Sequence, residues 1–172
     1  MLRKTILRQL CITGLGVGLT LSAATAQAAV LQVNIELPEF TQGPYHRPYV
    51  AVWIENEKHQ PVRQIALWYE DAEWLKDIRR WWRKAGRYGQ AETDAVTGAT
   101  RAPGHYQLVW DGKDAKGNLL PEGSYFVQIE VVREHGGRTL REVPISVPLK
   151  ALDISHPPEG ELGSVNLKVT QE

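Results

Sequence analysis

Residues 110–125 read Trp-Asp-Gly-Lys-Asp-Ala-Lys-Gly-Asn-Leu-Leu-Pro-Glu-Gly-Ser-Tyr, a turn-rich stretch between two runs with strand character. Asp114 and Gly117 have the spacing of a tight turn, because Asp accepts a hydrogen bond from a nearby backbone amide and Gly tolerates a positive φ. The runs on either side, 106–110 and 124–133, are rich in β-branched and aromatic residues. We therefore predict a hairpin here, in a chain built mainly from β-strands.

Further runs with strand character lie on both sides of this stretch. Leu31 to Leu37 alternates apolar and polar residues, which is typical of a half-buried strand. The other predicted strands are 49–55, 62–68, 138–149 and 162–169. We expect the first two of these to form a hairpin around 56–59, and Pro144 and Pro148 indicate an edge strand. Seven short strands with turns between them predict an antiparallel β-sandwich.

In the middle of the chain the spacing of apolar residues changes from that of a strand to that of a helix. One amphipathic helix is predicted there, over about residues 71–85. Trp74, Ile78, Trp81 and Trp82 follow the spacing of one helical stripe, and Gly86 can end the helix. Trp81 and Trp82 would point about 100° apart, so we expect one of the two rings to be partly exposed.

The opposite face of this helix is basic and carries Lys76, Arg79, Arg80 and Arg83. Its simplest interpretation is the solvated face of an amphipathic helix. The alternative is a docking surface for an anion or an acidic partner.

The turn-rich stretch also resembles a known module. Residues 110–118, followed by 121–125, are similar to the Ig-like module of flagellar hook-capping proteins. The resemblance implies an Ig-like sandwich and says little about function, because one fold hosts many functions.

The first 28 residues have the layout of a secretory signal peptide. Arg3, Lys4 and Arg8 precede an apolar run, and Ala26-Gln27-Ala28 is a small-x-small cleavage pattern. The apolar run is shorter than the roughly 20 residues that a spanning helix needs. We therefore expect cleavage after Ala28, export to the periplasm, and a single β-sandwich domain over residues 29–172.

The composition of the expected mature chain excludes several classes of protein. Its 144 residues contain no cysteine, because Cys11 lies in the signal peptide, so no disulfide partner is expected. Seventeen basic residues against twenty acidic ones give a net charge of −3. This charge argues against a nucleic-acid-binding protein.

The usual catalytic patterns are missing from the sequence. The five histidines are scattered, and no pair has ligand spacing on a predicted element, so we predict no metal site and disfavour a metal or small-ligand binder. No serine has the context of a nucleophile elbow, which argues against a hydrolase.

One segment has residues that the fold does not explain: Asp94-Ala95-Val96-Thr97-Gly98-Ala99-Thr100. It resembles the acceptor motif of FAD:protein FMN transferases, Asp-x-x-(Ser/Thr)-Gly-Ala-(Ser/Thr), through Asp94, Thr97, Gly98, Ala99 and Thr100. In that family the last hydroxyl residue carries FMN through a phosphodiester bond. The resemblance therefore implies covalent FMN on Thr100, in an exposed loop that we expect over about residues 89–104.

Neighbouring residues are candidates for contacts with the flavin, on the basis of their closeness in sequence. Trp81, Trp82 or Tyr88 would stack on the isoalloxazine ring. Arg87 and Arg101 would contact the phosphate or stabilise the reduced, anionic flavin.

The whole expected mature chain is similar to a family of small periplasmic proteins of unknown function, which share the stretches at 94–104 and 110–117. The resemblance implies association with FAD:protein FMN transferases and PepSY-type membrane proteins. The function expected from it is electron relay between a membrane reductase and an extracytoplasmic acceptor. The alternative is an Ig-like adaptor without a cofactor, which binds a membrane partner through the basic helix.

Overall fold

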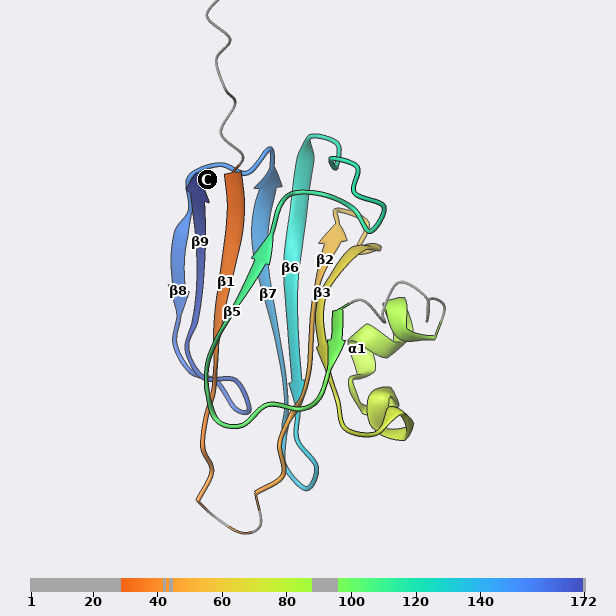
Figure 1. Ribbon diagram of the computed structural model, residues 1–172, viewed down its shortest axis with the longest axis vertical. Helices are drawn as coiled ribbons and strands as arrows, with labels where there is room; N and C mark the ends of the chain where they lie inside the picture. Colours follow the sequence, from red (N-terminus) through yellow and green to blue (C-terminus); the bar gives the residue numbers. More distant parts are fainter. Residues whose placement is uncertain (1–28, 42, 44, 88–95, 172) are drawn as a thin grey trace, which may run out of the picture.

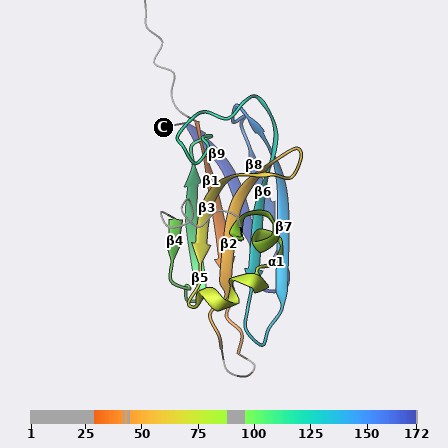
Figure 2. The same cartoon turned by 90° about the vertical axis from the view of Figure 1, so that its right-hand side faces the viewer.

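The computed structural model describes residues 29–41, 43, 45–87 and 96–171, which form two β-sheets packed face to face (Figures 1 and 2). The first sheet has the strand order β5-β1-β9-β8, and the second has the order β4-β3-β2-β6-β7. In the first sheet the strands are β1 (Ala29–Leu37), β5 (Gly104–Trp110), β8 (Asp153–His156) and β9 (Val165–Gln171). In the second they are β2 (Tyr49–Asn56), β3 (Pro61–Trp68), β4 (Thr97–Gly98), β6 (Gly123–Val132) and β7 (Arg138–Val147).

Apolar and polar side chains alternate along the strands, and the apolar ones form the core between the two sheets. Leu31, Val33 and Ile35 of β1 point inward and meet Val50 and Val52 of β2, because successive side chains of a strand point to opposite faces. All neighbouring strands are antiparallel apart from β3 and β4, which pair in parallel. The prediction of an antiparallel β-sandwich with an inserted helical segment is confirmed.

Strand β2 is buried on both of its faces, and its first six residues, Tyr-Val-Ala-Val-Trp-Ile, are all apolar or aromatic. Tyr49, Ala51 and Trp53 point away from the first sheet into a second apolar cluster. Leu75 and Trp81 of the helical segment complete this cluster, so the segment covers the outer face of the five-stranded sheet (Figure 1).

The helical segment consists of three short pieces, and the prediction of one continuous helix over 71–85 is wrong. The pieces are the 3-10 turn η1 (Ala72–Asp77), α1 (Arg79–Trp81) and the wide π-type turn η2 (Trp82–Gly86). Ile78 has φ −75° and ψ 71°, which breaks the helical path between η1 and α1. The break lets the Ile78 and Trp81 side chains, both buried, reach the sheet while Trp74 is 40% exposed.

Two other local predictions differ from the structure. The stretch 110–125 does not form a hairpin, because β5 pairs with β1 in one sheet while β6 pairs with β2 and β7 in the other. The stretch therefore crosses from sheet to sheet. Strand β8 (Asp153–His156) is not among the predicted strands. The 138–149 run supplies the predicted edge strand, since β7 ends its sheet.

Candidate functional site

The segment Thr97–Arg101 lies at the edge of the five-stranded sheet. Leu67 pairs with Thr97 and Trp68 with Gly98, and the backbone amide of Tyr69 donates a hydrogen bond of 3.0 Å to the carbonyl of Gly98. Only two residues of β4 pair with β3, so few backbone hydrogen bonds hold the segment to the sheet.

The structure does not require a glycine at position 98. Gly98 does not have a positive φ, and a Cβ atom placed there would meet Trp68 Cδ1 at 3.6 Å and Arg101 Nη2 at 3.8 Å. These are ordinary van der Waals distances. The identity of this motif residue is therefore not explained by backbone strain or by packing.

Arg101 and two aromatic rings fix the turn that follows Thr100. The Arg101 guanidinium lies 5.2 Å from the centre of the Trp68 ring, and the Trp68 and Tyr106 ring centres are 5.2 Å apart in an edge-to-face arrangement. Tyr106 donates a hydrogen bond of 2.7 Å to the carbonyl of Ala102. An exposed cation thus lies one residue after the candidate acceptor, and an arginine is a favourable partner for a phosphodiester.

Thr100 itself is 7% exposed, so the expectation of an exposed acceptor is wrong for this residue in the folded chain. Thr97 and Gly98 lie in β4 and are half-buried, which corrects the predicted loop for these two positions, whereas Ala99 and Arg101 are exposed. The positive charge of Arg101 therefore suits a phosphodiester on Thr100. The Thr100 hydroxyl, however, becomes accessible to solvent only when the Thr97–Arg101 segment separates from the sheet edge.

The other predicted flavin contacts fall in different environments. Trp81 is 2% exposed, and its indole nitrogen donates a hydrogen bond of 2.6 Å to Gln64 Oε1, so its ring belongs to the core and has no free face for a ligand. Trp82 is half-buried, in agreement with the expected partial exposure of one of the pair. Arg87 is exposed. Asp94 and Tyr88 lie outside the described residues.

A buried acidic carboxylate holds the helical segment against the sheet. Glu130 of β6 is fully buried and accepts hydrogen bonds from the backbone amides of Arg80 at 3.1 Å and Trp81 at 2.9 Å. Arg138 Nε donates to the same carboxylate at 2.6 Å. Glu130 thus satisfies amides at the start of α1 that have no partner within the helix.

A second buried carboxylate, Glu55 of β2, lies in a cluster that the sequence did not predict. Oxygen or nitrogen atoms of Glu55, His59 and Glu142 all lie within 4.8 Å of one another, and they form the one such group with metal-ligand chemistry among the described residues. Sequence reasoning missed it because these residues belong to different strands and a turn. The one available signal was a glutamate at the end of the apolar run of β2.

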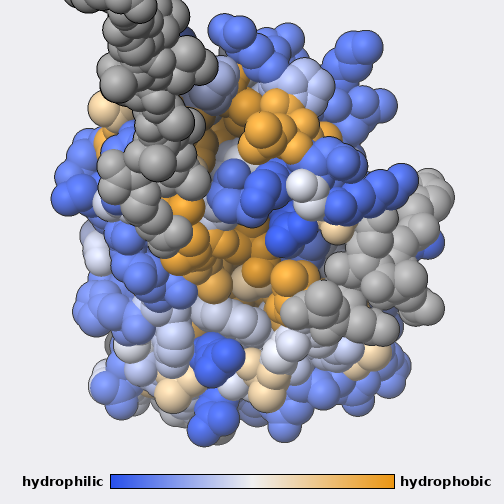
Figure 3. Space-filling model, turned by 45° about the horizontal axis from the view of Figure 1, so that its top comes forward, coloured by the Kyte–Doolittle hydropathy of each residue, from blue (hydrophilic) through white to orange (hydrophobic). Residues whose placement is uncertain are grey.

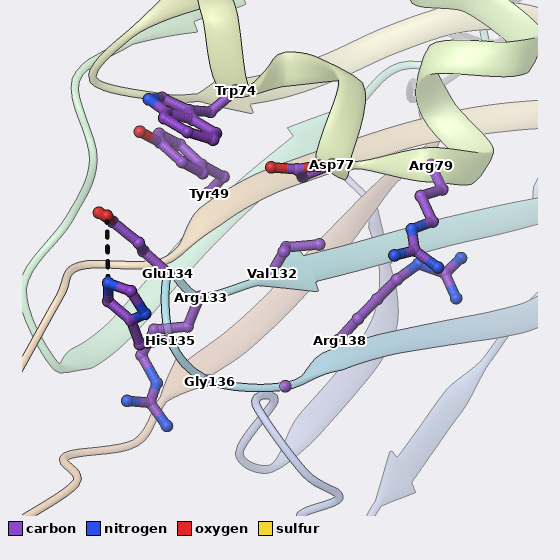
Figure 4. Close-up of a pocket in the computed structure, with 11 residues that line it drawn as sticks. Tyr49, Trp74, Asp77, Arg79, Val132, Arg133, Glu134, His135, Gly136 and Arg138 are labelled. Carbon is purple, nitrogen blue, oxygen red and sulfur yellow. Dashed lines mark ion pairs between the residues drawn. The ribbon is translucent and has the colours of Figure 1, made fainter.

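A cavity of about 460 Å³ lies between the helical segment and the β6–β7 turn (Figure 4). Its lining comprises Tyr49, Trp74, Asp77, Arg79 and residues 132–138. Trp74 and Tyr49 lie side by side at one end, and the guanidinium groups of Arg79 and Arg138 lie close together at the other. Burial raises the pKa of Tyr49 above its ordinary value. None of the lining residues belongs to the Thr97–Arg101 segment.

Apolar side chains also reach the surface at the end of the sandwich viewed in Figure 3. A cavity of about 430 Å³ at this end lies between β6, β7 and residues 149–152. Leu119 of the sheet-crossing stretch is 76% exposed.

None of the helical pieces that the structure describes has the length and hydropathy of a membrane-spanning helix.

The fold and the edge segment define a two-sheet β protein with an inserted helical segment and a motif at the sheet edge that packing does not explain. The family described as "Predicted periplasmic protein (DUF2271)" matches residues 30–164, and the chain belongs to this family, whose function is unknown. No curated protein gives a significant match to the chain. The solved structures give no significant match either.

Proposed function

We propose that this chain is a periplasmic flavoprotein that carries FMN covalently on Thr100 and relays electrons outside the cytoplasm. The observation that carries the proposal is the segment Thr97-Gly98-Ala99-Thr100-Arg101, which contains the last four residues of the acceptor motif at a sheet edge where packing does not require the glycine. The description of the family as periplasmic supports the compartment. Covalent attachment suits this compartment, because a dissociable flavin would be lost from it.

The attachment reaction is a phosphoryl-group transfer from FAD. The Thr100 hydroxyl oxygen attacks the FMN-side phosphorus of the pyrophosphate, and the bond from that phosphorus to the bridging oxygen breaks. AMP leaves, and the hydroxyl proton passes to a base of the transferase or to solvent. Such reactions depend on positioning and on neutralisation of charge. Arg101 follows the acceptor and supplies a positive charge beside the new phosphodiester.

The burial of Thr100 sets a condition on this reaction. The β4 segment must leave the edge of β3 before a transferase can reach the hydroxyl, since Thr100 is 7% exposed. A two-residue strand with a single edge partner opens at low cost compared with global unfolding. The transferase therefore acts on an opened edge or on the chain before it completes its folding.

The redox chemistry belongs to the flavin, and the chain supplies its position and surroundings. Within the proposal, the exposed Arg101 contacts the FMN phosphate, and the half-buried Trp82 stacks on the flavin ring. The electron donor is a membrane reductase of the PepSY type, and the modifying enzyme is an FAD:protein FMN transferase; both partners come from the resemblance of the sequence. The leader ends at Ala28, which N-terminal sequencing of the exported protein tests.

The test is co-expression of the exported chain with a periplasmic FMN transferase, followed by measurement of intact mass and flavin fluorescence in a denaturing gel. The expected result is a mass increase of one FMN less one water, together with fluorescence that survives denaturation. Thr100→Ala is expected to abolish both signals. Thr93→Ala is the matched control, because this threonine precedes the motif and the variant keeps every motif residue and the hydroxyl at position 100. An unmodified chain, beside a control substrate that the transferase modifies, would contradict the proposal, and FMN on Thr100→Ala would exclude the site.

The second candidate is a cofactor-free adaptor that binds a membrane partner through the helical segment. The observation that favours it is the exposure of Lys76, Arg79, Arg83 and Lys84 on this segment. An unmodified chain that still binds a membrane partner, and loses it when these four residues are replaced by Ser, is the result expected for the adaptor.

A further inference from the structure

We propose that Glu55, His59 and Glu142, with the side-chain amide oxygen of Gln128, form a binding site for one first-row divalent transition metal ion. The site is on the helical side of the five-stranded sheet. Val50 lies level with Trp68, and Glu55 lies five residues further along β2, so the site is about 17 Å from the level of Gly98. The proposal is therefore independent of the flavin on Thr100.

The ligand atoms come from three neighbouring strands of one sheet and from one turn. Glu55 lies near the end of β2, His59 in the turn that follows it, and Glu142 on β7. Gln128 lies on β6 between them, opposite Glu142 in the strand register. His59 Nδ1 is 3.3 Å from Glu55 Oε2 and 3.7 Å from Glu142 Oε2. Two carboxylates and one imidazole thus converge on a single point.

The structure fixes the direction of these ligands through surrounding contacts. Trp53 Nε1 donates a hydrogen bond of 2.9 Å to Glu55 Oε1, which leaves Oε2 directed at the cluster. The His59 ring stacks on Phe126 with centres 5.1 Å apart, and the His59 backbone has φ 53°, a conformation uncommon for a non-glycine residue. Partners of this kind orient the ligands of metal sites.

In this structure the cation in the cluster is the guanidinium of Arg80. Its Nη2 atom lies 2.5 Å from Glu55 Oε2, 3.2 Å from Glu142 Oε2 and 3.3 Å from His59 Nδ1. Two carboxylates against one guanidinium leave an excess charge of −1 when His59 is neutral. A divalent ion in place of the guanidinium would neutralise both carboxylates, and Arg80, which is 21% exposed at its side chain, has a path to solvent.

Two buried atoms show that Arg80 fills the site incompletely. Arg80 Nε and Gln128 Oε1 are both buried and have no hydrogen-bond partner. Gln128 is fully buried, and its amide nitrogen donates to Glu55 at 3.2 Å and also to Glu142, so its amide group lies within the cluster. Buried polar atoms without partners are rare and costly. The Gln128 amide nitrogen now faces both carboxylates, so a 180° rotation of the amide would bring Oε1 to a metal ion that has displaced the guanidinium.

The ligand set indicates the class of metal. One imidazole nitrogen with carboxylate and amide oxygens suits zinc, manganese, iron or cobalt, whereas calcium and magnesium prefer oxygen ligands alone. His59 is 44% exposed at its side chain, which leaves an entry route from solvent.

The experiment uses the full exported chain, stripped with a chelator and titrated with Zn²⁺ by calorimetry and with Co²⁺ by visible absorption. The expected result is one ion per chain and a Co²⁺ spectrum of a nitrogen–oxygen site. His59→Ala is expected to weaken binding by at least about tenfold. His135→Ala is the matched control, because this exposed histidine lies outside the cluster, and it is expected to bind as the parent does.

The Arg80→Met variant distinguishes a metal-binding site from a cluster that only forms salt bridges. If the ion replaces the guanidinium, this variant binds Zn²⁺ at least about tenfold more tightly, and Zn²⁺ raises its melting temperature more than that of the parent. The proposal is overturned if the parent chain binds no metal, if His59→Ala binds like the parent, or if binding disappears with His135→Ala. The His59 comparison stands even if Arg80→Met fails to fold.

Discussion

The hydrogen bonds of Glu130 give the most direct test of how the helical segment is held. This carboxylate is fully buried and accepts from the amides of Arg80 and Trp81 and from Arg138 Nε. Glu130→Ala removes all three acceptor contacts. The two amides belong to the helical segment and stay buried against the sheet without an acceptor. The Arg138 side chain is 34% exposed and can form hydrogen bonds with water instead.

The expected cost follows from these contacts. A hydrogen bond to a charged group contributes about 1.5–3 kcal/mol, and removal of one partner from a buried ion pair costs about 3–5 kcal/mol. We therefore expect Glu130→Ala to lower the free energy of unfolding by about 3–5 kcal/mol. A chain of this length has a total stability of roughly 7–20 kcal/mol, so the variant still folds. Glu130→Gln keeps an acceptor oxygen without the charge and is expected to cost about 1–3 kcal/mol.

Urea unfolding, followed by tryptophan fluorescence and circular dichroism, measures the effect at neutral pH. The control is Glu134→Gln on the adjacent turn, where an exposed carboxylate pairs with two histidines and contributes about 0–1 kcal/mol. The slope of the transition should stay unchanged if the denatured state is unaffected. A loss below about 1 kcal/mol for Glu130→Ala, or a loss equal to that of the control, would refute the role of Glu130 as the anchor of the helical segment.

Two further predictions concern the first sheet and its turns. The Ser164 hydroxyl and amide donate hydrogen bonds to Glu36 and hold the pKa of that carboxyl below its ordinary value of 4.5. This contribution is present above pH 4.5 and is lost as the pH falls through the lowered pKa, so Ser164→Ala should show a shallower loss of stability in acid titration; an unchanged acid profile would contradict this. Gly160 has φ 54° and its Cβ would lie 2.5 Å from Thr139 Oγ1, whereas a Cβ on Gly43, φ 75°, meets nothing within 4 Å. Gly43→Ala should cost about 1–2 kcal/mol from backbone strain alone, and Gly160→Ala at least about 1 kcal/mol more; equal melting temperatures would contradict the steric difference.

The sequence by itself determined the seven longer strands and the mainly β class, because side-chain alternation is a local property that each strand carries alone, whereas the short strands β4 and β8 were missed. The apolar run of β2 also contained the information that both of its faces are covered, since a strand with one wet face alternates. The helical segment was found in the right place, but its division at Ile78 was not, because the break serves contacts with β2 and β3.

The motif at Thr97–Arg101 was also readable from sequence, since it consists of adjacent residues. The burial and the contacts of its residues could not be predicted from the sequence. Thr100 is buried, and it lies between the β4 residues that pair with β3 and Arg101, which packs on Trp68. These contacts join parts of the chain some thirty residues apart. The sequence therefore identified the candidate acceptor, and the fold showed that β4 must separate from β3 before the acceptor is accessible.

The Glu55–His59–Glu142 cluster was decided by the tertiary structure alone. His59 is near Glu55 in sequence, but Glu142 reaches them only through the register of β6 with β2 and with β7. That register is set by which faces of the strands are buried and by the turns between them, which are properties of the whole sheet. Glu142, which lies more than eighty residues after Glu55 and His59 in the sequence, thus meets them because β2, β6 and β7 align.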